Sequence, residues 1–256
     1  MARTKPAQFE DRMTIVEHLD ELRSRIIVSL VAFGIAFALC FWQNHLLLDA
    51  VNAPLPNDTE PVTLSPTEPF FTTVEISAYG AFVLAMPILL YELWAFILPA
   101  FSPRERRAVT PFVFAMPLLF LAGIAFAYFV VMPVAVKFLL NFNDAQFNIQ
   151  VRAGEYYSFF GLTELAMGIL FQIPIVMLSL TRLDIVSADW FAKNRRYAIF
   201  IISIIAAAAP GGDPVSMMMI MIPLVLLYEV SIIVDRRFGR PASERVGGEV
   251  SPGEAG

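Results

Sequence analysis

Six apolar segments divide this chain, and they constrain its fold more than any other feature. The first four are nearly free of charge and are close to the ~20 residues that a helix needs to cross a bilayer. The fifth has 12 residues, which extend only ~18 Å as a helix. The segments are residues 26–42, 76–100, 111–136, 156–180, 198–209 and 215–234. We therefore predict an all-α polytopic membrane protein with six transmembrane helices, of which the last two are short.

Lysine and arginine are distributed unevenly between the stretches that link these helices. Sixteen of the 18 lie in the N-terminal stretch, in alternate loops and in the C-terminal tail, whereas only Lys137 and Arg152 lie in the other loops. Cytoplasmic loops of membrane proteins carry an excess of basic residues. Both termini are therefore predicted to be cytoplasmic. An odd number of spans would place the arginine-rich tail outside, so the charge pattern also favours six.

The chain is expected to form one membrane domain over residues 1–240. Residues 1–25 are predicted to be a cytoplasmic amphipathic region, with a capping box at residues 14–17 that starts a helix leading into the first span. Because these residues mix acidic and basic groups, they do not resemble a cleavable signal peptide. Residues 241–256 are polar and predicted to be a disordered cytoplasmic tail.

Composition excludes several classes of function. A net charge of −5 gives no basic excess for nucleic acid, so no nucleic-acid partner is expected. One cysteine and two histidines cannot supply a disulfide or a typical zinc site, and no metal or cofactor is expected. The motifs of membrane proteases, serine hydrolases and P-loop ATPases are absent. The chain is therefore predicted not to be an enzyme.

Three glutamates and one glutamine interrupt the apolar segments, where burying such a group is costly and often marks function. Glu92 and Glu229 lie near the cytoplasmic ends of their spans, each in a Leu-Leu-Tyr-Glu string, and can be explained as interfacial groups with one structural hydrogen bond. Glu164 and Gln172 are eight residues apart in the fourth span, which places them on similar faces of one helix. Gln172 lies nearest the middle of the bilayer and is expected to contact either a neighbouring helix or a bound polypeptide.

The positions of the prolines predict bends in the spans and an extended outer stretch. Pro87, Pro117, Pro133, Pro174 and Pro223 interrupt four of the spans and are expected to bend them into a concave bundle. Five more prolines lie in the outer stretch 45–75, which is therefore predicted to be a mostly extended cap with little helix.

Two carboxylates stand among basic residues on the predicted cytoplasmic side. They are Glu21, in residues 18–23, and Glu105, in residues 102–107. Fixed carboxylates can bind guanidinium groups through charge-assisted hydrogen bonds. Ion pairing with neighbouring arginines of the chain itself is the simpler interpretation, and composition alone favours it.

Seven motifs occur in order along the chain, at residues 18–23, 53–55, 69–71, 91–99, 105–107, 127–131 and 210–214. In this combination the chain resembles TatC, the multispanning core of the twin-arginine protein translocase. The resemblance covers residues 14–237.

This resemblance implies a receptor for the signal peptides of folded export cargo, which carry two adjacent arginines. It implies that acidic residues of the N-terminal region and of the first cytoplasmic loop read those arginines. These roles fall on Glu21 and Glu105, with Phe96, Arg23, Arg106 and Arg107 shaping the site.

The family pattern also bears on residues away from that site. The polar residue of the fourth span, often glutamate in the family, is Gln172 here, which keeps hydrogen bonding and removes a proton-carrying role. Glu164 is grouped with it as an intramembrane contact. Outer-loop structural roles are assigned to Pro54, Phe70, Phe71 and Asp213, the two phenylalanines as interfacial anchors.

The expected partners are TatA-like and TatB-like single-span proteins, twin-arginine signal peptides, membrane lipids and further copies of the chain. The resemblance implies transport driven by the proton motive force across a bacterial inner membrane. Two alternatives stay open at this point. One is a proton-coupled secondary transporter of a small solute that uses Glu92, Glu164 and Glu229. The other is a structural scaffold with no ligand.

Overall fold

The structure is a computed structural model that describes residues 15–56, 59–100, 103–146, 149–182, 185–208 and 214–238. Within these ranges the elements are helices, apart from one isolated β-bridge between Val62 and Arg152. Five helical stretches are long and apolar enough to cross a membrane: His18–Trp42, Glu68–Ile97, Phe114–Asn141, Ala153–Arg182 and Met217–Arg237. The prediction of an all-α, multi-span membrane protein is therefore confirmed.

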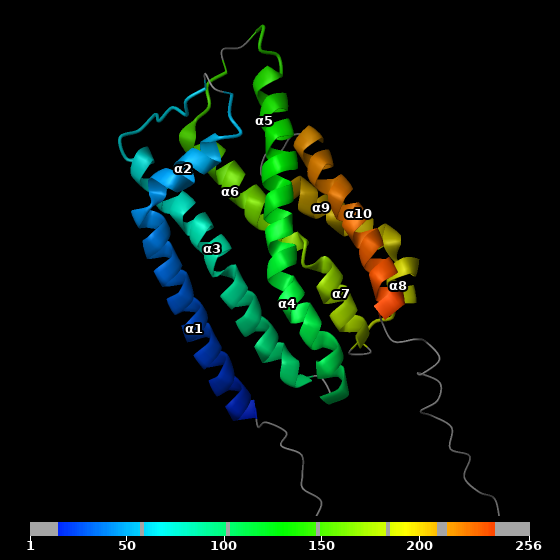
Figure 1. Ribbon diagram of the computed structural model, residues 1–256. Coiled ribbons are helices and arrows are strands. Elements are labelled where there is room, and N and C mark those ends of the chain that lie inside the picture. Colours follow the sequence, from blue (N-terminus) through cyan, green and yellow to red (C-terminus); the bar gives the residue numbers. More distant parts are fainter. Residues whose placement is uncertain are drawn as a thin grey trace, which may run out of the picture.

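Helix α1 (Ile15–Trp42) packs lengthwise against α3 (Glu68–Ile97) (Figure 1). α1 continues without interruption past residue 25, so the N-terminal amphipathic stretch and the first span form one helix. The predicted capping residue Thr14 lies outside the described residues, as do the rest of residues 1–14 and the predicted tail 241–256.

The outer stretch between these two helices is more helical than predicted. It contains α2 (Asn44–Asn52), and α3 already begins at Glu68. The prediction of an extended cap was wrong because the prolines begin only at Pro54, after α2 has ended. Pro69 is the second residue of α3, where a proline costs no hydrogen bond.

Two of the long stretches are interrupted helices. A π-helical turn η2 (Ala127–Val131) joins α4 (Pro103–Phe126) to α5 (Met132–Asn141). A break at residues 171–172 separates α6 (Ala153–Leu170) from α7 (Ile173–Arg182).

Only two of the five prolines expected to bend the spans lie next to a helix interruption. Pro133 and Pro174 each stand second in the helix that follows an interruption, where their missing N–H groups are not needed. Pro87 and Pro223 lie inside α3 and α10 (Pro214–Phe238), and Pro117 lies inside α4, without ending these helices. A proline inside an apolar helix therefore did not identify the breaks by itself.

The C-terminal part of the chain packs around α10. Its buried side chains, among them Ile220, Leu224 and Ile232, form a cluster with residues of α7, of α8 (Ala188–Lys193) and of α9 (Arg195–Ala208). With 14 residues α9 extends about 21 Å, less than the ~30 Å of a hydrocarbon core. This is the short fifth segment expected from the sequence.

Helices α4 and α6 approach each other closely at two glycines. A Cβ on Gly123 would lie 2.7 Å from the carbonyl oxygen of Met167, and one on Gly168 would lie 2.5 Å from the ring of Phe120. Small residues permit such close backbone packing between membrane helices. The crossing holds the third and fourth spans together.

The bundle has two distinct ends (Figure 1). α1 and α4 begin, and α3, α7 and α10 end, at what we call the basic end, after the lysines and arginines near these helix ends. α2 and the starts of α3 and α6 lie at the opposite end, the outer end. Large apolar side chains such as Leu30, Phe114 and Phe200 are exposed between the ends, as expected for a surface in contact with lipid.

Candidate functional site

The candidate ligand site lies at the basic end, where the start of α1 meets the end of α3. Glu21 and Arg25 are one turn apart on α1, and Arg25 reaches across to Glu92 on α3. Nη1 of Arg25 donates to Oε2 of Glu92 at 2.9 Å, while its Nε donates to Oε1 of Glu21 at 3.0 Å and its Nη2 donates to the same oxygen. One guanidinium thus bridges two carboxylates from different helices.

Glu21 keeps one carboxylate oxygen uncommitted. Its Oε2 is buried and accepts no hydrogen bond from the residues that the structure describes. The imidazole Nδ1 of His18 lies 3.8 Å from it. The side chains of Glu21 and Glu92 are only 18% and 16% exposed, so water screens their charges less than at an open surface.

Phe96 joins this site through an aromatic contact. The ring of His18 stacks on the ring of Phe96 with a centroid separation of 4.3 Å and an interplanar angle of 13°. Because His18 also lies 3.8 Å from Glu21, the imidazole connects Glu21 on α1 with Phe96 on α3.

The other predicted site residues have different placements. Arg23 is exposed on α1, and Arg106 donates from Nε to the carbonyl oxygen of Leu98 at 3.1 Å. Glu105 and Arg107 lie in the first two turns of α4, but their side chains are outside the described part of the structure.

Sequence reasoning missed Arg25 and Glu92 as members of this site. The spacing of Glu21 and Arg25, four residues apart on a helix, was a usable signal. Glu92 carried no such signal, because its partner Arg25 is 67 residues away in sequence. Glu229 likewise pairs with Arg195 at 3.0 Å, so both glutamates of the repeated string make ion pairs.

A second feature is a groove of about 640 Å³ between α1, α2, α3, α4 and α6. Its walls are mainly apolar, with Leu84, Leu121 and Phe160 among them, and Glu164 is the one carboxylate among its lining residues. Glu164 is 5% exposed, and neither of its oxygens has a hydrogen-bond partner among the described residues. An unpaired carboxyl in apolar surroundings is costly, so this groove can bind a donor.

Gln172 is placed differently from Glu164. It lies at the break between α6 and α7, so the prediction that both residues share a face of one continuous helix is wrong. Its Nε2 donates to the carbonyl oxygen of Met116 on α4 at 3.1 Å, and its Oε1 is buried with no hydrogen-bond partner among the described residues. Gln172 is not among the residues that line the groove.

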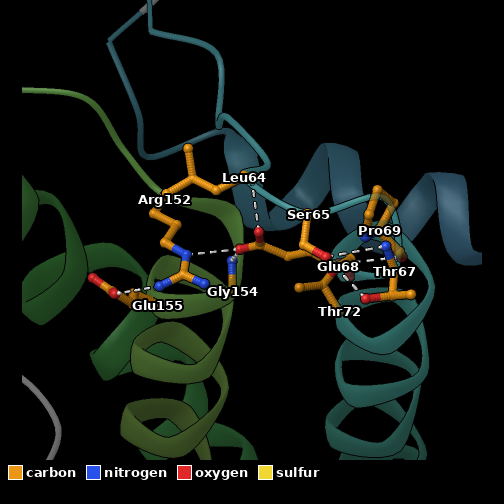
Figure 2. A network of polar contacts seen from close by, with 9 residues as sticks. All are labelled: Leu64, Ser65, Thr67, Glu68, Pro69, Thr72, Arg152, Gly154 and Glu155. Carbon is orange, nitrogen blue, oxygen red and sulfur yellow. Dashed lines mark hydrogen bonds and ion pairs between the residues drawn. The ribbon is translucent and has the colours of Figure 1, made fainter.

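At the outer end, Glu68 connects the starts of α3 and α6 (Figure 2). One oxygen accepts hydrogen bonds from Nε of Arg152 at 3.0 Å and from the backbone N–H of Gly154 at 3.3 Å, and the other accepts from the backbone N–H of Leu64 at 2.8 Å. Arg152 also pairs with Glu155 at 3.1 Å. The hydrogen bond to Glu68 raises the pKa of the Arg152 guanidinium above its ordinary value.

The residues assigned to outer-loop roles do not all lie in loops. Pro54 lies in the turn that follows α2. Phe70 and Phe71 are in the first turn of α3, not in a loop, and are 60% and 64% exposed. Asp213 lies outside the described residues. Among the residues described, no group of three potential ligands could hold a metal ion.

Comparisons with known proteins agree with this architecture. Residues 17–223 match the family model for TatC, the Sec-independent protein translocase protein. The TatC protein of Koribacter versatilis is 37% identical over 247 residues, which cover 91% of each chain. The chloroplastic TATC protein of Arabidopsis thaliana is 37% identical over 222 residues, which cover 86% of this chain and 65% of the plant protein.

A solved structure described as the twin arginine translocase receptor TatC superposes with a TM-score of 0.78 at 37% identity. The match covers 88% of this chain and 100% of that one. The fold, the order of the helices and the sequence similarity thus agree over most of the chain. The chain belongs to the TatC family of Sec-independent protein translocase proteins, and is a multi-span receptor subunit of that transport system, not an enzyme.

Proposed function

We propose that this chain binds the twin-arginine signal peptides of folded precursor proteins at its basic end, which faces the cytoplasm. The observation that carries the proposal is the uncommitted Oε2 of Glu21, a buried carboxylate oxygen beside the stacked rings of His18 and Phe96. A guanidinium is more weakly hydrated than an ammonium and stacks on aromatic rings, so it suits a buried acceptor beside two rings better. Glu105, with Arg23, Arg106 and Arg107 around it, completes the proposed site.

The proposed membrane topology has six spans, with α9 as the fifth. α9 and α10 run in opposite directions between the two ends of the bundle, and α10 ends at the basic end, where α1 begins (Figure 1). The charge distribution supports a cytoplasmic basic end. A bacterial inner membrane is the proposed location, with the proton motive force as the energy source.

We propose that the groove around Glu164 receives the membrane helix of a TatA-like or TatB-like single-span partner. The groove's apolar walls match an apolar helix, and Glu164 offers a hydrogen-bond partner for one polar side chain at that depth. Gln172 does not line this groove, so its buried Oε1 is proposed as an acceptor for a separate contact within the same complex. Lipids and further copies of this chain are additional proposed neighbours.

Direct binding tests the proposed ligand. A fluorescent twin-arginine signal peptide and its twin-lysine variant are titrated against the purified full-length protein in lipid nanodiscs. The arginine peptide should bind more tightly than the lysine peptide, and Glu21→Gln or Glu105→Gln should each weaken it. Asp20→Asn is the matched control, because it removes the same charge from the neighbouring exposed position.

Equal, weak binding of both peptides to the unmodified protein would refute the proposal. Unchanged affinity in Glu105→Gln would remove that residue from the site. Export of a twin-arginine reporter in cells that carry only the Glu21 and Glu105 variants tests the same roles in vivo. The solute-transporter alternative predicts no effect of either glutamate on such a reporter.

A further inference from the structure

Among the described side chains at the basic end, Glu21, Arg25 and Glu92 form one group of ion pairs in which the charges do not cancel. Glu21 and Glu92 contribute two negative charges and Arg25 one positive charge, all within hydrogen-bonding distance, so the group carries a net charge of −1. The guanidinium of Arg25 is divided between the two carboxylates. Each carboxylate is therefore only partly neutralised.

We propose that Glu92 is a further determinant of signal-peptide affinity, acting through Arg25. By sharing Arg25, Glu92 leaves Glu21 with negative charge available for an arginine of the ligand. This inference rests on the proposed function and assigns a role to two residues outside the motif-based site. Glu92 is a positioning and charge-balancing residue that need not touch the ligand.

The hydrogen-bond pattern supports this division of roles. Arg25 donates to Glu92 through Nη1 and to Glu21 through Nε and Nη2, and both bonds to Glu21 end on Oε1. Oε2 of Glu21 stays available on the side that faces His18. Because Oε2 is buried, a ligand guanidinium would reach it by displacing a neighbouring side chain such as His18, while Arg25 keeps both of its partners.

Loss of the Glu92 charge would change the net charge of this group. Arg25 would then pair with Glu21 alone and the group would be neutral, so an incoming arginine would have to compete with an internal one. The limited exposure of the three side chains, 16% to 23%, means that solvent only partly screens this difference. Charge complementarity at a binding site controls both the association rate and the choice of partner.

A cycle of charge-neutralising variants separates charge from structure. Glu92→Gln makes the group neutral, Arg25→Gln makes it −2, and the double variant returns it to −1. In the nanodisc titration with the twin-arginine peptide at low salt, Glu92→Gln should bind about tenfold more weakly, equivalent to about 1.4 kcal/mol. The double variant should recover to within about threefold of the unmodified protein, and Arg25→Gln alone should bind at least as tightly as that protein.

The rescue is the decisive result. If the double variant binds as weakly as Glu92→Gln, or if Arg25→Gln also weakens binding, then the three residues only hold α1 against α3 and the proposal is overturned. Melting temperatures measured on the same samples show whether each variant retains its fold. Because Arg25→Gln and the double variant carry opposite predictions to Glu92→Gln, failure of one variant to fold leaves the proposal testable.

Failure of this inference is distinguishable from failure of the proposed function. Glu21→Gln tests the function, because it removes the acceptor itself. If Glu21→Gln loses the peptide and Glu92→Gln does not, the role of Glu92 is wrong and the function stands. If Glu21→Gln binds as the unmodified protein does, the proposed site fails and the role of Glu92 fails with it.

Discussion

Replacing Gly123 by alanine should destabilise the crossing of α4 and α6. The new methyl group would lie 2.7 Å from the carbonyl oxygen of Met167 and 2.9 Å from Cα of Gly168. Both are backbone atoms, so no side-chain rotation can relieve the contact. The two helices would have to separate until the atoms reach ordinary contact distances of ~3.5 Å or more.

The expected cost follows from two opposing effects. Overpacking a tightly packed contact typically costs ~1–3 kcal/mol. Alanine in place of glycine inside a helix returns ~0.5–1 kcal/mol. Gly123→Ala should therefore lower the free energy of unfolding by about 1 kcal/mol, within a range of about 0–2.5 kcal/mol, as the difference between these two effects.

Gly34→Ala is the matched control. It lies in α1, and a methyl group there would meet nothing within 4 Å, so only the gain in helix propensity remains. Thermal unfolding of the two purified variants in one detergent, followed by tryptophan fluorescence, makes the comparison. A melting temperature for Gly123→Ala equal to or above that of Gly34→Ala would refute the close crossing.

Three other substitutions give expectations for the same assay. Glu68→Gln replaces an acceptor oxygen with an amide that faces donors, such as the N–H of Leu64, and should cost ~1–3 kcal/mol; an unchanged melting temperature would argue against the network in Figure 2. Tyr156→Phe removes a 2.7 Å hydrogen bond to the carbonyl oxygen of Val51 and should cost ~1–2 kcal/mol, provided the carbonyl stays buried, and no loss would mean that another donor replaces it. Glu164→Leu should raise the melting temperature of the isolated protein, because it removes an unpaired buried carboxyl, and should reduce reporter export; a lower melting temperature would show that Glu164 has a partner.

The sequence predicted the long helices well, because hydropathy over ~20 residues reports directly on burial in a bilayer. Short helices and helix breaks were predicted less well. The sequence did not predict helix α2, because the prolines that follow it suggested an extended stretch, whereas residues 44–52 themselves contain no proline. The break before Pro174 and the uninterrupted helix around Pro87 have similar sequence signals, and only packing against neighbouring helices separates the two cases.

Family motifs pointed to residues on both α1 and α3, but not to the ion pair that joins these two helices. Glu21 and Phe96 were identified through family motifs, and the structure brings them together through His18. The link between Arg25 and Glu92 depends on the register of α1 against α3, which no local pattern in either helix specifies. Gln172 and Glu164 illustrate the same limit: Gln172 lies in the break between α6 and α7, and of the two residues only Glu164 lines the groove.

The π-helical turn Ala127–Val131 has a consequence for how this membrane span tolerates mutation. Such a turn holds one residue more than an α-helical turn, and each residue of an α-helix rotates the following side chains by ~100°. Phe120 before the turn and Met132 after it are both fully buried, so the extra residue keeps two separate packing faces aligned. Deleting a single residue there would restore a regular helix and turn one of these faces toward lipid. The span therefore has a fixed residue count in its middle, although its apolar composition alone would accept either length.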